Sequence, residues 1–180
     1  PRQGDLILRT LFADEFRVRT GAELDPGQIV TTPEGSKSAI ESIFRFMRAQ
    51  RKTILLFSPL WHGYLYYAKD TGAILDGICT ERSEGYLPVA EKIEAFLRRP
   101  SSKRVGAVLF NNYTTPTGAG WDETQARGYI EAINRVRPDL TIIEDNLCWV
   151  CGHRSDKFVS FAQVAPQLLL LGRQADVHAS

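Results

Sequence analysis

The sequence predicts an α/β fold of three layers, in which a mostly parallel central sheet carries helices on both faces. Two observations favour this fold. Short apolar runs alternate with amphipathic stretches of about ten to fifteen residues along the chain. The runs at 53–57 and 105–110 are almost continuously apolar, as expected for parallel strands that are buried on both faces. Helices between such strands let neighbouring strands run in the same direction.

The helices are predicted from apolar side chains that recur at helical spacing. Residues 5–20 carry such a stripe, which ends before the helix breakers Gly21, Pro26 and Gly27. Residues 122–135 begin with an acidic capping residue and then continue with helical periodicity. The complete set of predicted helices covers residues 5–20, 36–50, 63–71, 89–97, 122–135 and 161–171.

The strands are predicted from β-branched and aliphatic runs between these helices. The run TILLF at 53–57 and the run VGAVLF at 105–110 are the clearest examples, and LTII at 140–143 ends directly before two acidic residues. The complete set of predicted strands covers residues 28–31, 53–57, 73–79, 105–110, 140–143 and 176–179. We expect one domain, or one part of one, because no repeat or low-complexity linker interrupts the pattern.

Composition and charge exclude several classes of protein. The chain has 180 residues, of which 43% are hydrophobic and 24% are charged, and its formal net charge is +1. This balance is typical of a folded globular domain and argues against a disordered chain or a nucleic-acid binder, which needs a surplus of cations. We find no long apolar run and no charged-then-apolar leader, so we expect neither a membrane partner nor secretion.

The three cysteines do not form a recognisable disulfide or metal framework. Cys148 and Cys151 make a C-x-x-C pair with His153 close behind, but zinc usually needs a second such pair and haem attachment needs the histidine directly after the second cysteine. We interpret the pair as coincidence or core packing and predict no metal. An odd number of cysteines in a chain of this length favours the reducing cytoplasm.

The predicted strand exits carry the candidate functional residues, because open α/β sheets bind ligands beyond the carboxyl ends of their strands. Gly35, Ser36 and Lys37 begin a predicted helix, where free N–H groups and the positive end of the helix dipole suit an anion such as phosphate. Trp61 follows the strand at 53–57 and can stack on a flat ring. Asp145 follows the strand at 140–143 and needs a cationic partner.

Each of these residues also has a structural interpretation when it is taken alone. A glycine and a serine often begin a helix, a tryptophan often packs under a loop, and an aspartate often caps a helix or pairs with an arginine. Taken together, a phosphate cradle, an aromatic ring, a hydroxyl and amide cluster at 111–118, and a buried acid describe a pocket for a phosphorylated aromatic ring.

The chain resembles the large domain of the fold-type I pyridoxal-phosphate-dependent enzymes, in the class I/II aminotransferase group. The resemblance spans nearly the whole chain, and PTG and the strand-end aspartate are its most specific parts. The segments that carry it are GDLILRTLFADEF, DPGQIV, PEGSKSAI, SPLWHGY with DTGA, NNYTTPTG, and IIEDNLC.

This resemblance implies roles for individual residues. Gly35, Ser36 and Lys37 would bind the phosphate of pyridoxal 5'-phosphate, and Trp61 would stack on its pyridine ring. Asp145 would pair with the pyridinium nitrogen, which keeps the ring protonated and able to accept electrons from a substrate carbanion. On this basis Asp145 is the catalytic residue that we predict within the chain.

Two residues depart from the family pattern around the cofactor's ring oxygen. Thr115 stands where the family has asparagine, and Cys148 stands where it commonly has tyrosine. A threonine hydroxyl can donate a hydrogen bond, whereas a thiol is a poor donor, and Asn112 is a candidate replacement for the missing amide. These two departures argue against ordinary transamination but are compatible with a cofactor site.

The resemblance also implies parts that this sequence does not contain. In the family, the Schiff-base lysine follows a short strand, which residues 176–180 (DVHAS) resemble, and Lys157 comes too early to take that role. We therefore expect residues 1–180 to be part of the cofactor-binding large domain, with the small C-terminal domain absent. The resemblance further implies a homodimer.

The leading hypothesis is a pyridoxal-phosphate-dependent enzyme that acts on an amino acid, as an aminotransferase or a divergent relative that catalyses elimination, oxidation or carbon–carbon bond chemistry. A second hypothesis is a non-catalytic sensor domain of a winged-helix transcription regulator, which an upstream basic DNA-binding domain would distinguish. A third is an α/β binding domain with an accidental resemblance, which loss of cofactor binding on replacing Asp145 would exclude.

Overall fold

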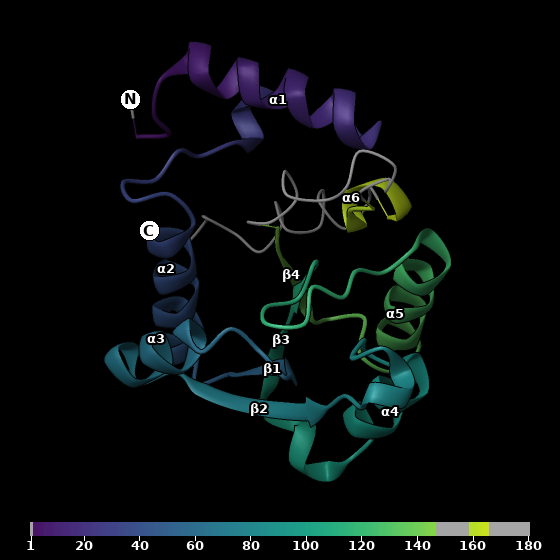
Figure 1. The fold of residues 1–180 in the computed structure, drawn as a ribbon. Helices are drawn as coiled ribbons and strands as arrows, with labels where there is room; N and C mark the ends of the chain where they lie inside the picture. Colours follow the sequence, from purple (N-terminus) through teal and green to yellow (C-terminus); the bar gives the residue numbers. More distant parts are fainter. Residues whose placement is uncertain (1, 147–158, 166–180) are drawn as a thin grey trace.

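The fold is a parallel sheet with helices packed on both faces (Figure 1). A computed structural model describes residues 2–146 and 159–165. The strands lie in the order β2-β1-β3-β4, and all three pairings between neighbours are parallel. The strands are β1 (Thr53–Ser58), β2 (Ile74–Cys79), β3 (Val105–Asn111) and β4 (Thr141–Asp145). The predicted three-layer class is therefore confirmed.

The helices follow the predicted pattern closely, with three additional 3₁₀ turns. The α-helices are α1 (Leu6–Thr20), α2 (Ser36–Ala49), α3 (Gly63–Thr71), α4 (Ala90–Leu97), α5 (Glu123–Val136) and α6 (Phe161–Val164). The 3₁₀ turns are η1 (Pro26–Gln28), η2 (Arg82–Glu84) and η3 (Pro100–Arg104). Local chemistry explains the helix ends: the Asp122 side chain accepts from the backbone N–H of Gln125 at the start of α5, and Gly21 ends α1 with a φ of 72°.

Alternate side chains of the central strands form two separate cores. Ile54 and Leu56 of β1 pack with Phe44 of α2 and Tyr64 of α3 on one face. Leu55 and Phe57 point to the opposite face, where they belong to a larger core that includes buried residues of α4, α5 and α6. Because side chains alternate along a strand, the fully apolar β1 run supplies both cores, as the sequence predicts.

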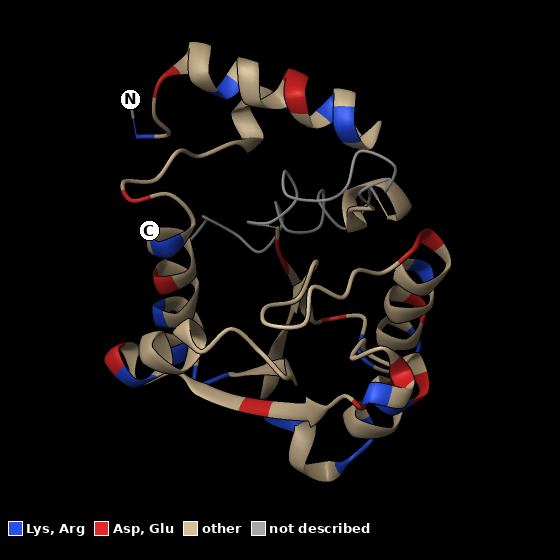
Figure 2. Cartoon of the chain, in the orientation of Figure 1, with Lys and Arg blue, Asp and Glu red and all other residues tan. Residues whose placement is uncertain are grey.

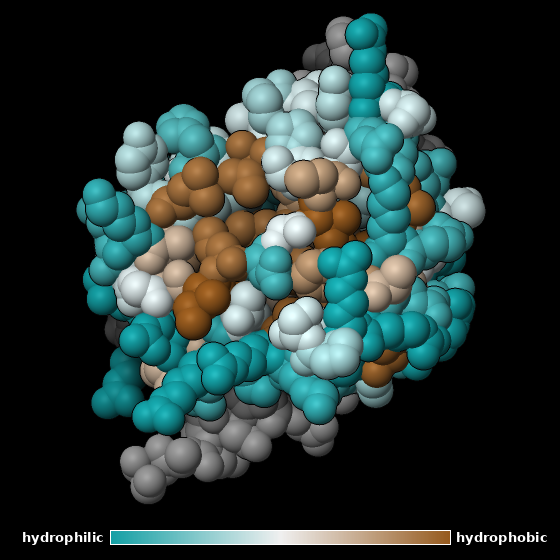
Figure 3. Space-filling view, turned by 90° about the horizontal axis from the view of Figure 1, so that it is seen from below, coloured by the Kyte–Doolittle hydropathy of each residue, from teal (hydrophilic) through white to brown (hydrophobic). Residues whose placement is uncertain are grey.

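Charged residues of both signs are interspersed along the helices (Figure 2). Pairs one helical turn apart connect Glu41 with Arg45 and Glu123 with Arg127. Seen from the side of β2, the surface carries a patch of apolar side chains bordered by hydrophilic ones (Figure 3). In residues 2–146 and 159–165, no helix combines the length and the apolar character that crossing a bilayer requires.

Two of the predicted elements are wrong in whole or in part. Residues 28–31 do not form a strand: Gln28 ends η1, where its side chain accepts from the backbone N–H of Asp25, and Thr31 makes one backbone bond to Gln3. In the described part of the chain, no neighbouring strand pairs with residues 28–31 through backbone hydrogen bonds. The helix predicted at 161–171 ends at Val164, because Ala165 has a φ of −148°. Residues 166–171 and the predicted strand at 176–179 lie outside the described residues.

Candidate functional site

The carboxyl ends of β1, β3 and β4 meet at one edge of the sheet, because these strands are parallel. Asn111, the last residue of β3, is directly opposite Asp145, the last residue of β4. Ser58 ends β1 at the same edge and leads to Trp61 and then to α3. The loops after these three strands therefore bring most of the predicted site residues to one region, as expected for an open α/β sheet.

Asp145 lies half-buried at the end of β4 and is held from the neighbouring helix. The Tyr64 hydroxyl of α3 donates a hydrogen bond of 2.6 Å to Asp145 Oδ2. Tyr64 itself is only 1% exposed, so the donor is fixed by the core around it. Hydrogen bonds to a charged group are among the stronger ones in proteins. This bond therefore fixes the direction of the carboxylate and leaves Oδ1 as its other acceptor.

The start of α2 has the features of an anion site. Gly35 precedes the helix with a φ of 65°, a conformation that glycine adopts without strain, and no side chain in the described part of the chain caps the helix. Among these residues, the first N–H groups of this 14-residue helix therefore have no side-chain acceptor, and the helix dipole adds partial positive charge. Ser36 is half-buried and Lys37 is exposed. The predicted phosphate-binding residues thus lie where an anion is favoured.

A cavity of about 440 Å³ connects this helix start with the end of β4. Ser36 and Asp145 both line it, together with Phe12 and Phe16 of α1. The remaining lining residues are Ala39, Ile40, Ile43, Ile143, Glu144 and Asn146. The structure therefore brings Ser36 and Asp145 to a single, mostly apolar cavity, whereas the other predicted phosphate residues, Gly35 and Lys37, are not among the residues that line it.

Trp61 is half-buried at the exit of β1 and packs onto the start of α3. A Cβ atom on Gly63 would lie 2.4 Å from the Trp61 ring, so the indole lies directly over this glycine. The ring also meets the Tyr64 ring edge-on at a centroid distance of 5.3 Å. Trp61 is thus one contact away from Asp145, through Tyr64, although it is not among the residues that line the 440 Å³ cavity.

The loop after β3 places Thr115 and Asn112 differently. Thr115 is half-buried, and its backbone N–H donates to Asn111 Oδ1 at 3.1 Å. Asn112 is 1% exposed, and its side chain is engaged inside the fold: Nδ2 donates to the carbonyl of Val159, and Oδ1 accepts from the backbone N–H groups of Tyr113 and Trp121. A contact from Asn112 to a cofactor remains a prediction. Cys148, with Cys151 and His153, lies outside the described residues.

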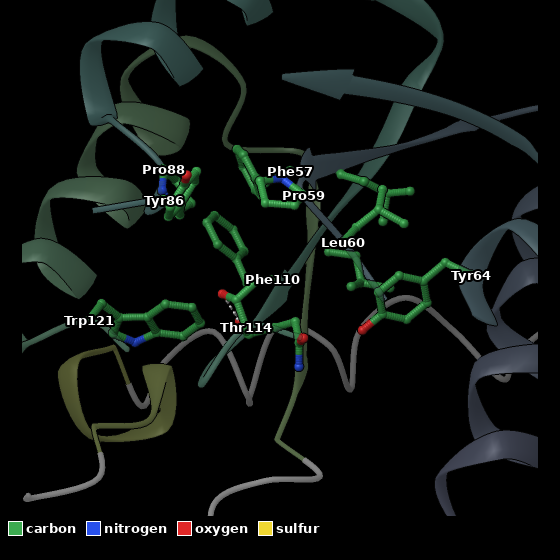
Figure 4. A pocket seen from close by; sticks show the side chains of 12 residues that line it. Phe57, Pro59, Leu60, Tyr64, Tyr86, Pro88, Phe110, Thr114 and Trp121 are labelled. Carbon is green, nitrogen blue, oxygen red and sulfur yellow. Dashed lines mark hydrogen bonds between the residues drawn. The ribbon is translucent and has the colours of Figure 1, made fainter. Parts of the chain in front are cut away.

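A second, much smaller cavity of about 20 Å³ lies between the exits of β1 and β3. Phe110 stands between Trp121 on one side and Tyr64 on the other (Figure 4). The Phe110 ring stacks on Tyr129 and meets the Phe161 ring edge-on. This volume corresponds to about one water molecule. The small cavity is lined by Tyr64, Phe110 and Trp121 and is not large enough for a cofactor.

Glu144 is a half-buried acid with an enclosed carboxylate beside Asp145, and sequence reasoning missed it. Its Oε2 accepts hydrogen bonds from Ser160 Oγ at 2.7 Å and from the backbone N–H of Phe161 at 3.0 Å, whereas Oε1 is enclosed and has no partner among residues 2–146 and 159–165. Burial raises the pKa of Glu144 to about 7, against the smaller, opposite effect of the hydrogen bonds. The side chain therefore connects β4 to the start of α6.

Sequence reasoning also missed Asn111 and Tyr64, which both bind Asp145. Asn111 Nδ2 donates to the Asp145 carbonyl at 3.0 Å, across 34 positions of the sequence, and Tyr64 reaches the carboxylate across 81 positions. The position of Asn111 at a predicted strand exit was a usable signal. Nothing in the helical pattern of residues 63–71 distinguishes Tyr64 from the other tyrosines of α3.

The fold is an open α/β domain with a cavity at the carboxyl edge of its sheet. A family model for aminotransferase class I and II matches residues 1–136. The chain therefore belongs to the class I and II aminotransferase family, and the resemblance found in its motifs is confirmed.

Curated proteins and solved structures agree with this assignment. The aspartate/prephenate aminotransferase of Thermus thermophilus is 26% identical over 169 residues, and the probable aspartate aminotransferase of Streptomyces griseus is 28% identical over 142 residues. These matches cover 93% and 78% of this chain, and 41% and 62% of the respective relatives. The chain thus spans less than two thirds of the length of either relative.

Two solved structures illustrate the shared fold. The aspartate aminotransferase from Thermus thermophilus with maleate superimposes with a TM-score of 0.78 at 23% identity, over 92% of this chain and 41% of that one. The pyridoxal-phosphate-bound C–S lyase from Staphylococcus hominis has the same TM-score at 13% identity, with the same coverage. Identities this low establish the fold alone.

Proposed function

We propose that this chain is the cofactor-binding part of a pyridoxal-phosphate-dependent enzyme that acts on an amino acid, by transamination or a related reaction at the same carbon. The family and the names of the relatives support the proposal. The observation that carries it is the 440 Å³ cavity, which has the uncapped start of α2 on one side and Asp145 on the other. An anionic phosphate and a protonated ring nitrogen match these two ends.

The polar groups at the two ends of the cavity match the charges of this cofactor. Gly35, Ser36 and Lys37 would hold the phosphate through backbone N–H groups, a hydroxyl and an ammonium group. The Asp145 carboxylate, directed by Tyr64, would hold a proton on the ring nitrogen. When bound, pyridoxal phosphate supplies a ring that accepts electrons from the α-carbon of the substrate.

The remaining predicted contacts complete the proposal. Trp61 would stack on one face of the ring, and its position over Gly63 brings it next to the tyrosine that binds Asp145. Thr115, Asn112 and Cys148 would surround the ring oxygen. We further propose a homodimer in the cytoplasm, on the strength of the family resemblance and the cysteine usage.

Titration of the full-length protein with pyridoxal 5'-phosphate tests the proposal, with cofactor absorbance and tryptophan fluorescence as readouts. We expect Asp145→Ala to weaken binding by about ten- to a hundredfold, because the variant loses a charge-assisted contact of about 1.5–3 kcal/mol. The control Asp70→Ala removes an exposed carboxylate of α3 and should bind like the parent. A parent protein that takes up no cofactor, or an Asp145→Ala variant that binds like the parent, would refute the proposal.

A further inference from the structure

Asn111 makes a two-sided contact between the ends of β3 and β4. Its Nδ2 donates to the backbone carbonyl of Asp145 at 3.0 Å, and its Oδ1 accepts from the backbone N–H of Thr115 at 3.1 Å. The orientation of the amide follows from these partners, because the reversed orientation would place oxygen against oxygen and N–H against N–H. One rigid, planar group therefore spans the gap between Asp145 and Thr115.

This contact lies where the sheet's own hydrogen bonds end. Asn111 and Asp145 form the last register pair between β3 and β4, and each is the last residue of its strand. The Thr114 hydroxyl donates to the Asn111 carbonyl at 2.9 Å, which fixes the main chain of Asn111 itself. The side chain of Asn111 thus adds a hydrogen-bonded connection beyond the last strand pair, between the end of β4 and the loop that carries Thr115.

We infer that Asn111 is a positioning residue that sets the separation between Asp145 and Thr115. The inference rests on the proposed function, in which Asp145 contacts the ring nitrogen and Thr115 contacts the ring oxygen of the same bound cofactor. A rigid ring can satisfy both contacts only if the two residues are held at one separation. Asparagine suits this role because its side chain offers a donor and an acceptor in one plane.

The experiment compares Asn111→Ala and Asn111→Asp with the parent in the full-length protein. Asn111→Ala removes both bonds, whereas Asn111→Asp keeps an acceptor for Thr115 and loses the donor to the Asp145 carbonyl. The readouts are pyridoxal 5'-phosphate affinity and the ¹⁵N chemical shift of its labelled ring nitrogen, which reports whether that nitrogen is protonated. Asn134→Ala, an exposed asparagine of α5, is the matched control.

We expect Asn111→Ala to bind the cofactor about tenfold more weakly, the effect of losing one to two hydrogen bonds. The ring-nitrogen signal of both Asn111 variants should move toward the unprotonated position at neutral pH, while Asn134→Ala matches the parent. If Asn111 acts through Asp145, the substitution should not shift this signal further in an Asp145→Ala background. Should Asn111→Ala fail to fold, Asn111→Asp and the same background comparison decide the question.

Two results would overturn the inference. One is a folded Asn111 variant with the affinity and the ring-nitrogen signal of the parent. The other is an equal effect of the substitution with and without Asp145, which would mark a purely structural role. Failure of the proposed function has a different signature, because Asp145→Ala itself would then leave cofactor binding unchanged.

Discussion

The two faces of the sheet are built for different tasks. The face covered by α4 and α5 is closed by aromatic rings, among which the fully buried Phe110 contacts Phe57, Trp121, Tyr129 and Phe161. The face covered by α2 and α3 has a smaller core, and beside it the 440 Å³ cavity reaches the end of β4. Close packing stabilises the first face, whereas the second combines packing with polar groups that a ligand can use.

Strand β4 shows this difference in two consecutive acids. Asp145 accepts a hydrogen bond from Tyr64 of α3, while Glu144 accepts one from Ser160 at the start of α6, and both acids line the 440 Å³ cavity. Because side chains alternate along a strand, neighbouring carboxylates enter different environments. Position at a strand end therefore does not by itself identify a functional acid. The hydrogen-bond partners distinguish the two acids: Tyr64 of α3 directs the Asp145 carboxylate, whereas Ser160 and Phe161 tie the Glu144 carboxylate to α6.

The largest expected effect comes from opening the aromatic face. Phe110→Ala should lower the free energy of unfolding by about 3–5 kcal/mol, because it removes a fully buried ring and leaves a cavity. Urea unfolding followed by circular dichroism measures this loss. The control Phe46→Ala removes a phenylalanine of α2 that is 52% exposed and should cost much less. Equal losses for the two variants would contradict the proposed division between the faces.

The next effect is a pH dependence of stability that originates at Glu144. Burial raises its pKa from the ordinary value of 4.5 to about 7 in the folded protein. Between these pH values the unfolded chain has released the proton and the folded chain still holds it. Glu144 therefore contributes on the order of 3 kcal/mol to the free energy of unfolding below about pH 4.5. This contribution is lost as the pH rises to about 7.

Unfolding free energies of the parent and of Glu144→Gln, measured from pH 4.5 to 8, isolate this contribution. Glutamine keeps an acceptor for Ser160 and Phe161 but does not titrate, so the difference between the two proteins should change steadily across the interval. Glu131→Gln, at an exposed position of α5, corrects for the removal of one charge. A parent whose stability follows the Glu144→Gln profile at every pH would show that the acid is solvated in the folded state.

Local chemistry made most of the fold predictable from sequence. The TILLF run, the Asp122 cap and the glycine stops act within a few residues of the elements that they define, and those elements form as expected. The prediction failed at residues 28–31, where β-rich composition suggested a strand. Strand formation needs a partner, and the nearby Asp25 and Gln28 instead close a 3₁₀ turn by a capping box.

The candidate site was predictable to the extent that it follows from strand direction. Asp145 could be assigned to the pocket because parallel strands end at one edge, whereas the start of α2 followed from the anion preference of a helix start, since the strand predicted before it does not form. The residues that direct Asp145 could not be found in this way. Tyr64 and Asn111 contact it from distant positions in the chain, and their roles depend on side-chain directions that only the packed structure defines.

The smallest expected effect concerns the face covered by α2 and α3, where Tyr64 belongs to the core and also binds Asp145. Tyr64→Phe keeps the buried ring and removes only the hydroxyl that donates to Asp145 Oδ2. We expect a loss of about 1 kcal/mol in the free energy of unfolding, as for a typical hydrogen bond, and a several-fold weaker affinity for pyridoxal 5'-phosphate. Tyr66→Phe is the matched control, because this α3 tyrosine is 64% exposed. If Tyr64→Phe lowers stability and leaves cofactor affinity at the parent value, the hydroxyl serves the core alone, and the division between the two faces is less complete than the structure indicates.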